Sequence, residues 1–324
     1  MRILLTGRSG QLGWELERAL APLGEMVALD RAGLDLADPE RIRSVLREIK
    51  PGLIVNAAAY TAVDRAESEP EAAFAINERA PCILAEEAGR LGALLIHYST
   101  DYVFDGTKTG PYSEEDTPGP LNVYGASKLE GEKAIAASGA RHWIFRTSWV
   151  YAPRGKNFFL TVLRLAREGK PLRVVTDQLG APTSAAMLAR ATAQALSTQA
   201  QALSTRAQAL STQAQALSTQ PQVLSTTSAQ YPAPPSGLYH MSAGGRTSWH
   251  GFACAVLREF GLADPVAAIA AAEYPTPAKR PANSLLDTGR LAASFGIRMP
   301  SWEAGLREAV AALNATEARP PADR

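Results

Sequence analysis

The sequence predicts an α/β fold: a doubly wound parallel sheet of the Rossmann type with a smaller α/β substrate domain. Short β-rich runs alternate with longer helical stretches along the chain, which is typical of parallel sheets with helices on both faces. A glycine-rich turn directly follows the first apolar run, and polar motifs follow most of the later runs. Because ligands bind beyond the carboxyl ends of such strands, these motifs are expected to meet in one crevice.

The first apolar run, residues 1–6, predicts a buried strand, and a turn with Gly7, Gly10 and Gly13 follows at once. Glycines are needed here because the turn is tight, a pyrophosphate must approach the backbone, and the next helix must pack closely on the sheet. The spacing G-x-x-G-x-x-G departs from the G-x-G-x-x-G dinucleotide fingerprint. The physical reason for the glycines therefore carries over, although the simple motif does not match.

The second predicted strand, residues 26–29, ends in Asp30. An acidic residue at this place accepts hydrogen bonds from the adenosine ribose of NAD. Arg31 follows directly and Arg8 lies in the glycine turn, so either could instead hold the 2′-phosphate of NADP, and both cofactors are expected to be accepted. In the alternative interpretation Asp30 only caps its strand and the arginines face solvent.

Later runs predict four more strands, at residues 53–56, 93–99, 142–147 and 172–175. Helix starts are marked by Asp38 before Pro39 and by Ser301 before Trp302, since each is an N-cap residue ahead of a helical pattern. Polar motifs at residues 56–58, 99–101 and 146–149 lie at the ends of three of the strands.

Tyr124 and Lys128 give the strongest indication of chemistry. If residues 122–138 form a helix, their spacing of four puts both side chains on one face. A free tyrosine has a pKa near ~10, and a nearby lysine charge lowers it by favouring the phenolate. A tyrosine tuned in this way protonates an alkoxide as it forms. The pair could arise by chance, but Ser99-Thr100-Asp101 and the glycine turn support a site for hydride transfer.

Composition narrows the partners. The 324 residues are 46% hydrophobic and 20% charged, enough for a sizeable core in two lobes, and the net charge of +1 gives no reason to expect nucleic acid or an anionic membrane. Cys82 and Cys254 are far apart and the four histidines are scattered, which predicts neither disulfides nor a metal site. The N-terminus lacks a signal-peptide pattern and no apolar stretch could span a bilayer, so a cytoplasmic location is expected.

Residues 193–227 form a tandem repeat of seven residues, Ala-Gln-Ala-Leu-Ser-Thr-Gln in its first copy. Its leucine period could line one stripe of a coiled coil. We prefer an expanded insertion without a chemical role, because Arg206 is the one charged residue in the intact copies and the Ser-Thr pairs form helix poorly. It could prolong a helix that begins near Ser184, and the Pro-rich residues 228–236 then form a linker.

Several motifs can be read together. Besides the glycine turn, Asn77 and the Tyr124/Lys128 pair, the chain contains the runs VNAAAYTAVD (55–64), STDYVFDG (99–106), RTSWVY (146–151), DQLGAPT (177–183) and RPANS (280–284). With these motifs the sequence resembles one family, the dTDP-4-dehydrorhamnose reductases, which are extended short-chain dehydrogenase/reductases. The resemblance spans nearly the whole chain outside the repeat, the linker and the tail.

The resemblance implies reduction of the C4 ketone of dTDP-6-deoxy-L-lyxo-4-hexulose to dTDP-L-rhamnose, the last step in making this sugar donor. NADPH or NADH would deliver hydride, Tyr124 would protonate the alkoxide, Lys128 would hold the nicotinamide ribose and lower the pKa of Tyr124, and Thr100 would hydrogen-bond the reacting oxygen. Asp101 and Trp149 would contact the sugar. The residues expected at the cofactor are Gly7, Gly10, Gln11, Leu12, Gly13, Asp30, Arg31, Asp35, Leu36, Ala57, Ala58, Tyr60, Tyr124 and Lys128.

Related activities are weighed by single residues. Sugar-nucleotide 4,6-dehydratases carry a second acid after the Thr-Asp pair, whereas this chain has Tyr102, so dehydration is disfavoured. A regulatory relative similar to the β subunit of methionine adenosyltransferase stays an alternative, since fold and site are separable from function. A reductase of another nucleotide-4-keto sugar is a further alternative. Arg280 could reach a phosphate of the sugar nucleotide or lie in a surface loop.

Metal, assembly and domain limits complete the expectations. Some members of the family join two subunits through magnesium, and Glu15 matches one of their glutamates, but residues 185–187 are Ala-Ala-Met where another is expected. We therefore predict no metal, take Glu15 for a solvated helix residue, and leave a homodimer open. The expected domains are 1–150 for the dinucleotide and, mainly, 151–313 for the sugar nucleotide, with a disordered tail over 314–324.

Overall fold

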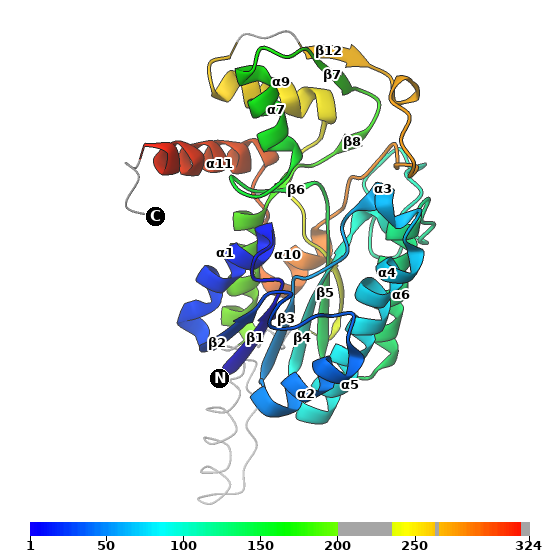
Figure 1. Ribbon diagram of the computed structural model, residues 1–324, viewed down its shortest axis with the longest axis vertical. Coiled ribbons are helices and arrows are strands. Elements are labelled where there is room, and N and C mark those ends of the chain that lie inside the picture. Colours follow the sequence, from blue (N-terminus) through cyan, green and yellow to red (C-terminus); the bar gives the residue numbers. More distant parts are fainter. Residues whose placement is uncertain (200–234, 263–265, 319–324) are drawn as a thin grey trace, which may run out of the picture.

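The structure is a computed structural model that describes residues 1–199, 235–262 and 266–318. It has a parallel sheet with helices on both faces, and a second lobe lies above the carboxyl ends of the strands (Figure 1). The predicted fold class is confirmed. The predicted linker up to residue 234 and the repeat beyond residue 199 lie outside the described residues.

The main sheet has six strands in the order β10-β5-β4-β3-β1-β2, and every neighbouring pair is parallel. The order along the chain reverses between β1 and β3, and ligands bind at such a switch point in open α/β sheets. The strands are β1 (Arg2–Thr6), β2 (Glu25–Leu29), β3 (Leu53–Asn56), β4 (Leu94–Thr100), β5 (His142–Thr147) and β10 (Gly237–His240).

Two apolar cores sandwich this sheet. On one face α1, α10 and a helix over residues 185–199 cover alternate residues of the strands, among them Leu5, Ile96 and Phe145. On the other face α2, α5 and α6 cover the residues between, among them Leu4 and Leu95. The covering helices are α1 (Gln11–Leu20), α2 (Pro39–Ile49), α5 (Ala80–Leu91), α6 (Val123–Ala137) and α10 (Gly289–Phe295).

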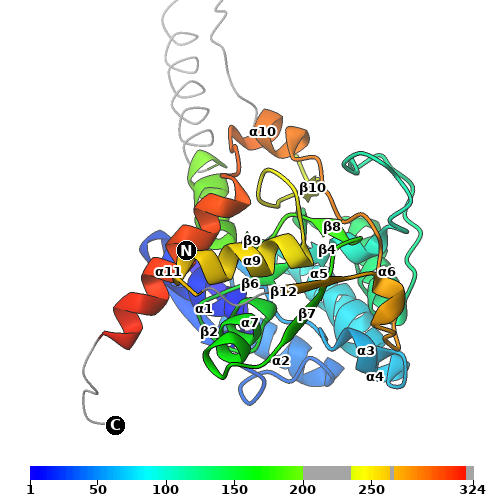
Figure 2. The ribbon, with the colours of Figure 1, turned by 90° about the horizontal axis from the view of Figure 1, so that it is seen from above.

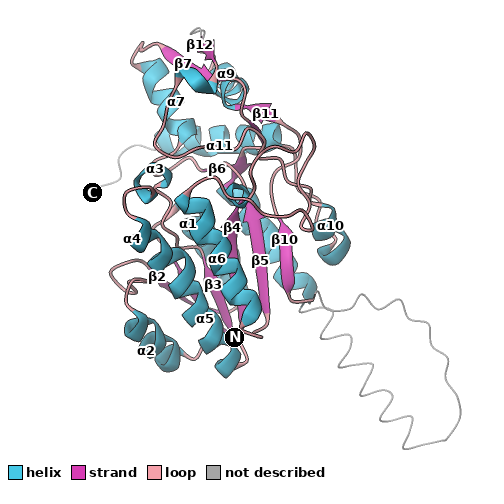
Figure 3. Ribbon diagram, turned by 90° about the vertical axis from the view of Figure 1, so that its right-hand side faces the viewer, coloured by secondary structure: helices cyan, strands magenta, loops and turns pink. Residues whose placement is uncertain are grey.

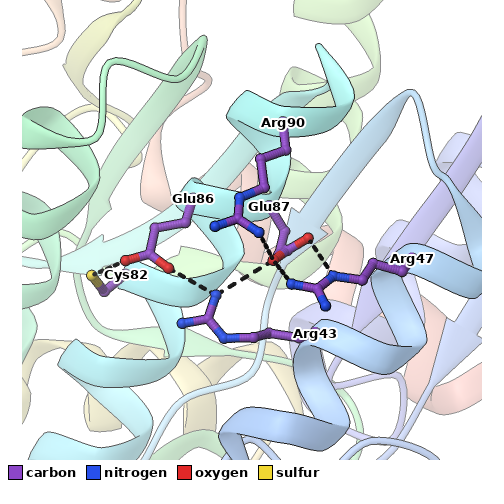
Figure 4. Close-up of polar contacts among 6 residues, drawn as sticks. All are labelled: Arg43, Arg47, Cys82, Glu86, Glu87 and Arg90. Carbon is purple, nitrogen blue, oxygen red and sulfur yellow. Dashed lines mark hydrogen bonds and ion pairs between the residues drawn. The ribbon is translucent and has the colours of Figure 1, made fainter.

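A buried carboxylate joins α2 to α5 at the rim of the second core. The side chain of Glu87 is 2% exposed and pairs with Arg47 at 2.9 Å and with Arg43 and Arg90 at 3.4 Å (Figure 4). The guanidinium of Arg47 holds the pKa of this carboxyl below its usual value. The predicted caps also form: Asp38 accepts from the Arg41 amide at the start of α2, and Ser301 accepts from the Ala304 amide at the start of α11 (Trp302–Glu317).

The second lobe has its own core, in which α7, α9 and α11 pack together and the short parallel strand pair, β7 with β12, lies against α7 and α9. Figure 2 looks down on this lobe. Its elements are α7 (Phe158–Arg167), β7 (Leu172–Val175), α9 (Trp249–Glu259), β12 (Val266–Ile269) and α11 (Trp302–Glu317), with the pairs β6 (Val150–Tyr151) and β9 (Thr183–Ser184), and β8 (Leu179–Gly180) and β11 (Thr247–Ser248).

Short helices complete the chain: α3 (Val63–Ala66), α4 (Pro70–Phe74), a π-helical turn η2 (Ala75–Arg79), and the 3₁₀ turns η1 (Ala21–Leu23), η3 (Asp101–Val103) and η4 (Ala271–Glu273). Among the described helices, none is long and apolar enough to cross a membrane.

Three expectations need correction, and one is confirmed. The run at 172–175 is a strand, but it pairs with β12 rather than in the main sheet. The sixth strand of that sheet is instead β10, which lies beside β5 in Figure 3. Residues 193–199 prolong a helix that begins at residue 185, as expected, and Leu196 is buried in the core, so the first repeat copy belongs to the fold. Residues 314–317 continue α11, where Glu317 pairs with Arg167, and are not a tail.

The chain therefore returns twice from the second lobe to the main sheet. The helix over residues 185–199, β10 and α10 return to the main sheet after α7 and β7 have begun the second lobe. The division of the chain into domains at residue 150 stays a prediction.

Candidate active site

A cavity of about 790 Å³ lies where the carboxyl ends of the strands meet the second lobe. Each of the first five strands of the main sheet contributes a residue that ends or follows it, and α1, α6, α7, α9 and several loops contribute further residues. The strand-end residues are Gly7, Asp30, Ala57, Thr100 and Thr147.

The glycine turn closes tightly under one end of this cavity. Gly7 has φ +74°, a conformation that favours glycine, and a Cβ there would lie 2.7 Å from the amide nitrogen of Ala58. A Cβ on Gly13 would lie 2.0 Å from the carbonyl oxygen of Gly7. Gly10 is the N-cap of α1 and has no side chain to cap the first N–H groups of the helix, and Gly10, Gln11 and Leu12 line the cavity. This arrangement suits a phosphate group.

The second strand places Asp30 at the same cavity. Its Oδ1 accepts from the amides of Ala32 at 3.0 Å and Gly33 at 3.1 Å, which fixes the carboxylate at the rim. Arg31 pairs with Asp35 at 3.4 Å, and its side chain is 80% exposed. Arg8 pairs with Glu17 at 3.1 Å and lines a smaller adjoining hollow that also touches Asp30. Carboxylate and guanidinium groups are thus both available where an adenosine ribose would lie.

Helix α6 brings Tyr124 and Lys128 to the cavity. It begins at Asn122, whose side chain accepts from the Gly125 amide at 2.8 Å and donates to the Lys279 carbonyl at 2.7 Å. A Cβ on Gly125 would lie 2.2 Å from the Tyr102 carbonyl oxygen, so the helix approaches that backbone closely. Tyr124 and Lys128 both line the cavity, as their spacing predicts.

The Lys128 ammonium nitrogen is buried beneath the cavity. Nζ donates to the Tyr98 carbonyl oxygen at 2.6 Å and lies 2.9 Å from Nε2 of His97. Burial lowers the pKa of Lys128 to about 7, because the charged form loses its water.

Burial has the opposite effect on Tyr124, whose pKa it raises to about 12; the Thr100 hydroxyl offsets this in part and the Asp101 charge adds to it. Lys128 is not among the causes of this shift. The expected lowering of the pKa of Tyr124 by Lys128 is therefore wrong for this structure. The physical reason is that desolvation outweighs attraction to an ammonium that is itself destabilised and bound elsewhere.

Thr100 and Asp101 lie next to Tyr124. The Thr100 hydroxyl donates to Oδ1 of Asp101 at 3.2 Å and accepts from the Tyr102 amide at 3.2 Å. Asp101 is 3% exposed, and among the described residues its Oδ2 has no hydrogen-bond partner. Burial raises the pKa of Asp101 to about 7. A buried, partly satisfied carboxyl group at a cavity wall is typical of a functional site.

Trp149 lies on the other wall of the cavity, between the two lobes. Its φ is +49°, which is strained for a large side chain. Its ring stacks on Trp249 with centroids 3.6 Å apart and an angle of 7° between the planes. A Cβ on Gly180 would lie 2.4 Å from the same ring, so Gly180 and Trp249 hold Trp149 from two sides.

All but one of the predicted site residues line this single cavity. Those from the cofactor set are Gly7, Gly10, Gln11, Leu12, Asp30, Arg31, Asp35, Leu36, Ala57, Ala58, Tyr60, Tyr124 and Lys128, and those from the substrate set are Thr100, Asp101 and Trp149. Gly13 instead packs behind the turn against Gly7. Arg280 pairs with Asp64 through both nitrogens of its fork, at 3.1 and 2.8 Å, and is outside the lining.

Sequence reasoning missed the part of the lining that comes from the second lobe. Trp249 and Phe252 of α9, and Lys156 and Phe158 at the start of α7, face the same cavity. These residues sit in no recognisable motif, and the order of the chain does not reveal that α7 and α9 pack together over the sheet. One usable signal was the pair Ser248-Trp249, because a serine N-cap marks the helix start that places Trp249.

Glu15 differs from its expected place in solvent. It is half-buried on α1, and burial raises the pKa of its carboxyl while Arg154, Arg18 and Arg190 oppose that rise. Three guanidinium groups around one carboxylate make this position unfavourable for a magnesium ion. Within the described residues no group of three or more His, Cys, Asp or Glu side chains could hold a metal.

Comparison with known proteins gives consistent matches over the whole chain. The family model described as RmlD substrate binding domain matches residues 1–210 and 206–315. A dTDP-4-dehydrorhamnose reductase of Burkholderia thailandensis is 46% identical over 310 residues, which cover 93% of this chain and 95% of that protein.

Solved structures agree with these relatives. A dTDP-4-dehydrorhamnose reductase of Clostridium acetobutylicum superposes with a TM-score of 0.83 at 32% identity, covering 97% of this chain and 100% of that one. A dTDP-4-dehydrorhamnose reductase of Bacillus anthracis in complex with NADP gives a TM-score of 0.79 at 32% identity, covering 96% and 99%.

Proposed function

The chain belongs to the dTDP-4-dehydrorhamnose reductase family, and from this premise we propose which of its residues perform the reaction. The activity is the NAD(P)H-dependent reduction of the C4 ketone of dTDP-4-dehydro-L-rhamnose to dTDP-L-rhamnose, the last step of dTDP-rhamnose synthesis. The observation that supports the assignment of residues is that Thr100, Tyr124 and Lys128 share one cavity with the glycine turn.

The residues of the lower half of the cavity fit NADP or NAD. The glycine turn and the first N–H groups of α1 would hold the pyrophosphate, and Asp30 with Arg31 the adenosine ribose and its substituent. Asp35, Leu36, Ala57, Ala58 and Tyr60 would line the adenosine and ribose path. Lys128 would hold the nicotinamide ribose. When bound, the reduced nicotinamide supplies the hydride for the C4 carbon of the sugar.

Tyr124 acts as the general acid. Because burial raises its pKa to about 12, the phenol keeps its proton at neutral pH and can give it to the oxygen that becomes an alkoxide. The Thr100 hydroxyl donates to Oδ1 of Asp101 at 3.2 Å in this structure, and with substrate bound it would turn its one hydrogen to the reacting oxygen and orient it. General acid assistance typically contributes ~10²–10⁴-fold.

The second lobe supplies the sugar-nucleotide half of the cavity. Asp101 and Trp149 would contact the sugar, and the stacked Trp149 and Trp249 give an apolar wall for it. Lys156 would offer a cation to the diphosphate. This space lies between the carboxyl ends of the strands and the second lobe, so a bound sugar nucleotide would be held between the two lobes.

The test follows NADPH and NADH absorbance with the purified protein and dTDP-6-deoxy-L-lyxo-4-hexulose. Wild type should oxidise the cofactor only with substrate, and Tyr124→Phe should lose at least ~100-fold of the rate while its thermal unfolding stays unchanged. Full activity in a folded Tyr124→Phe protein would contradict the role of Tyr124. Cofactor binding without turnover would favour the regulatory relative or another nucleotide-4-keto sugar.

The proposal also covers the oligomeric state of the protein and its location in the cell. A homodimer is proposed, and sedimentation at several protein concentrations measures it. A cytoplasmic location is proposed because dTDP-sugar synthesis is the named activity of the relatives, and fractionation of cells that express the chain tests it.

A further inference from the structure

A row of buried polar side chains runs through the sheet behind Lys128, and the proposed reaction uses only its last member. The Thr6 hydroxyl donates to Oδ1 of Asn56 at 2.7 Å, and Nδ2 of Asn56 lies 3.0 Å from Nδ1 of His97. Nε2 of His97 lies 2.9 Å from Nζ of Lys128. Each of these four residues is 1% exposed.

The row is built into the register of the sheet. Thr6 of β1 is the ladder partner of Asn56 of β3, and Asn56 is the ladder partner of His97 of β4. Neighbouring residues in a parallel ladder point to the same face, so three adjacent strands place these side chains side by side beneath α6. Polar groups buried at this depth must be hydrogen-bonded to be tolerated.

The hydrogens of the row allow two complete arrangements, which differ in the charge of Lys128. If the Asn56 amide donates to Nδ1, then the hydrogen of a neutral His97 is on Nε2, and only an uncharged Lys128 amine can accept it. If the Asn56 amide is instead turned over, so that its nitrogen donates to the Thr6 hydroxyl and its oxygen accepts from Nδ1–H of His97, then Nε2 is free to accept from the Lys128 ammonium. Lys128 donates to the Tyr98 carbonyl in both.

We propose that His97 is a positioning residue for the reaction: its Nε2 accepts a hydrogen bond from the Lys128 ammonium, and Asn56 sets the tautomer that leaves this acceptor free. The inference rests on the role of Lys128 in the proposed function. It gives the buried ammonium a second partner besides the Tyr98 carbonyl and thereby favours the charged lysine that faces the cofactor. His97 itself stays neutral, because burial and the neighbouring Lys128 charge both lower its pKa well below the usual value.

Few other charges act on Lys128. Glu132 lies one turn further along α6 and raises the pKa of Lys128, but its carboxylate is held by Arg146 of β5 at 2.6 and 2.9 Å. Tyr124 on α6 and Asp101 after β4 line the same cavity. His97 is thus the one titratable group within hydrogen-bond distance of Nζ among the described residues.

The test compares three variants by the alkaline limb of the pH profile of kcat/KM, which is the fall in rate as Lys128 loses its proton. His97→Leu removes the acceptor, and since a hydrogen bond to a charged group is worth about one to two pKa units, the limb should move down by about that much. His97→Gln keeps an acceptor and should restore the limb. Asn56→Asp offers only acceptor atoms to Nδ1, favours the charged lysine, and should move the limb up.

A second readout is independent of turnover. NADPH affinity is measured by fluorescence without substrate over the same pH range. As the pH rises, this affinity should begin to weaken at a lower pH in His97→Leu than in wild type. Leu95→Ala is the matched control, because Leu95 is buried on the same face of β4 two residues earlier and packs in the apolar core. It should lower stability and leave both profiles in place.

The possible failures are distinguishable. The inference would be overturned if a folded His97→Leu protein kept the wild-type alkaline limb of kcat/KM. It would also be overturned if Leu95→Ala moved that limb by the same amount as His97→Leu. If His97→Leu does not fold, Asn56→Asp decides instead: the inference would be overturned if the alkaline limb of kcat/KM in this variant stayed in place or moved to lower pH. A wild type that binds NADPH but does not turn over substrate would contradict the proposed function, while the affinity profiles would still decide the role of His97.

Discussion

Replacing Asp101 by asparagine should stabilise this protein in a pH-dependent way. Asp101 is 3% exposed, Oδ1 accepts from Thr100, and among the described residues Oδ2 has no partner. Burial raises its pKa from the usual 3.8 to about 7. Asn keeps the shape of a protonated aspartate and cannot acquire its charge, so Asp101→Asn removes the cost of ionising this buried group.

The size of the effect follows from proton linkage. Between about pH 4 and pH 7 the folded protein keeps a proton on Asp101 that the unfolded chain has released, so the free energy of unfolding of wild type falls as the pH rises through this window. One pKa unit corresponds to ~1.36 kcal/mol, and a shift of about three units gives ~4 kcal/mol above pH 7. Below about pH 4 both states are protonated and the cost vanishes.

Urea unfolding of wild type and Asp101→Asn at about pH 4 and about pH 8 measures this difference. The variant should match wild type at the lower pH and exceed it by ~2–4 kcal/mol at the higher one, while its reductase activity falls. Asp105→Asn is a control of opposite sign, because the Thr107 amide and the Tyr112 hydroxyl lower the pKa of Asp105. A difference that is equal at both pH values, or a variant less stable at about pH 8, would refute the reasoning.

Three substitutions test the packing around the site. Gly7→Ala places a Cβ against backbone at φ +74° and should weaken NADPH binding at least ~10-fold by fluorescence titration, whereas Gly92→Ala, with φ +64° in open space, should cost only ~1 kcal/mol of stability. Gly180→Ala should displace Trp149 and lower kcat/KM by ~10–100-fold with cofactor affinity unchanged; normal kinetics would refute that contact. Leu196→Ala should lower the free energy of unfolding by ~2–4 kcal/mol, and an unchanged value would place the first repeat copy outside the core.

Local signals in the sequence predicted most of the main sheet. The apolar runs at residues 2–6, 53–56 and 142–147 are buried on both faces, and such strands read as continuous hydrophobic stretches. β10 was missed because four residues after a Pro-rich segment carry little pattern, and its pairing with β5 spans almost a hundred residues. β7 was found, but a strand pattern does not say which strand it pairs with, and here the partner is β12.

The candidate site divides in the same way. Residues at strand ends could be predicted, because parallel strands bring their carboxyl ends to one edge whatever the rest of the chain does. Trp249 and Lys156 could not, since they reach the cavity only through the packing of α7 and α9. His97 sits in an apolar run where a single histidine reads as core, and its contact with Lys128 depends on how α6 crosses β4.

The ionisation of the site residues was the property that the sequence predicted least well. The spacing of Tyr124 and Lys128 suggested mutual attraction and a tyrosine of lowered pKa, yet burial acts on both groups at once and raises one pKa to about 12 while lowering the other to about 7. Desolvation wins because Lys128 is buried between α6 and β4, and Tyr124, which is partly exposed at the cavity, lies against the buried Thr100 and Asp101. A tyrosine that holds its proton suits the reductive direction, in which the sugar oxygen must gain one. The lysine then needs a partner to stay charged beneath the cavity, and of the described side chains His97 is placed to be that partner.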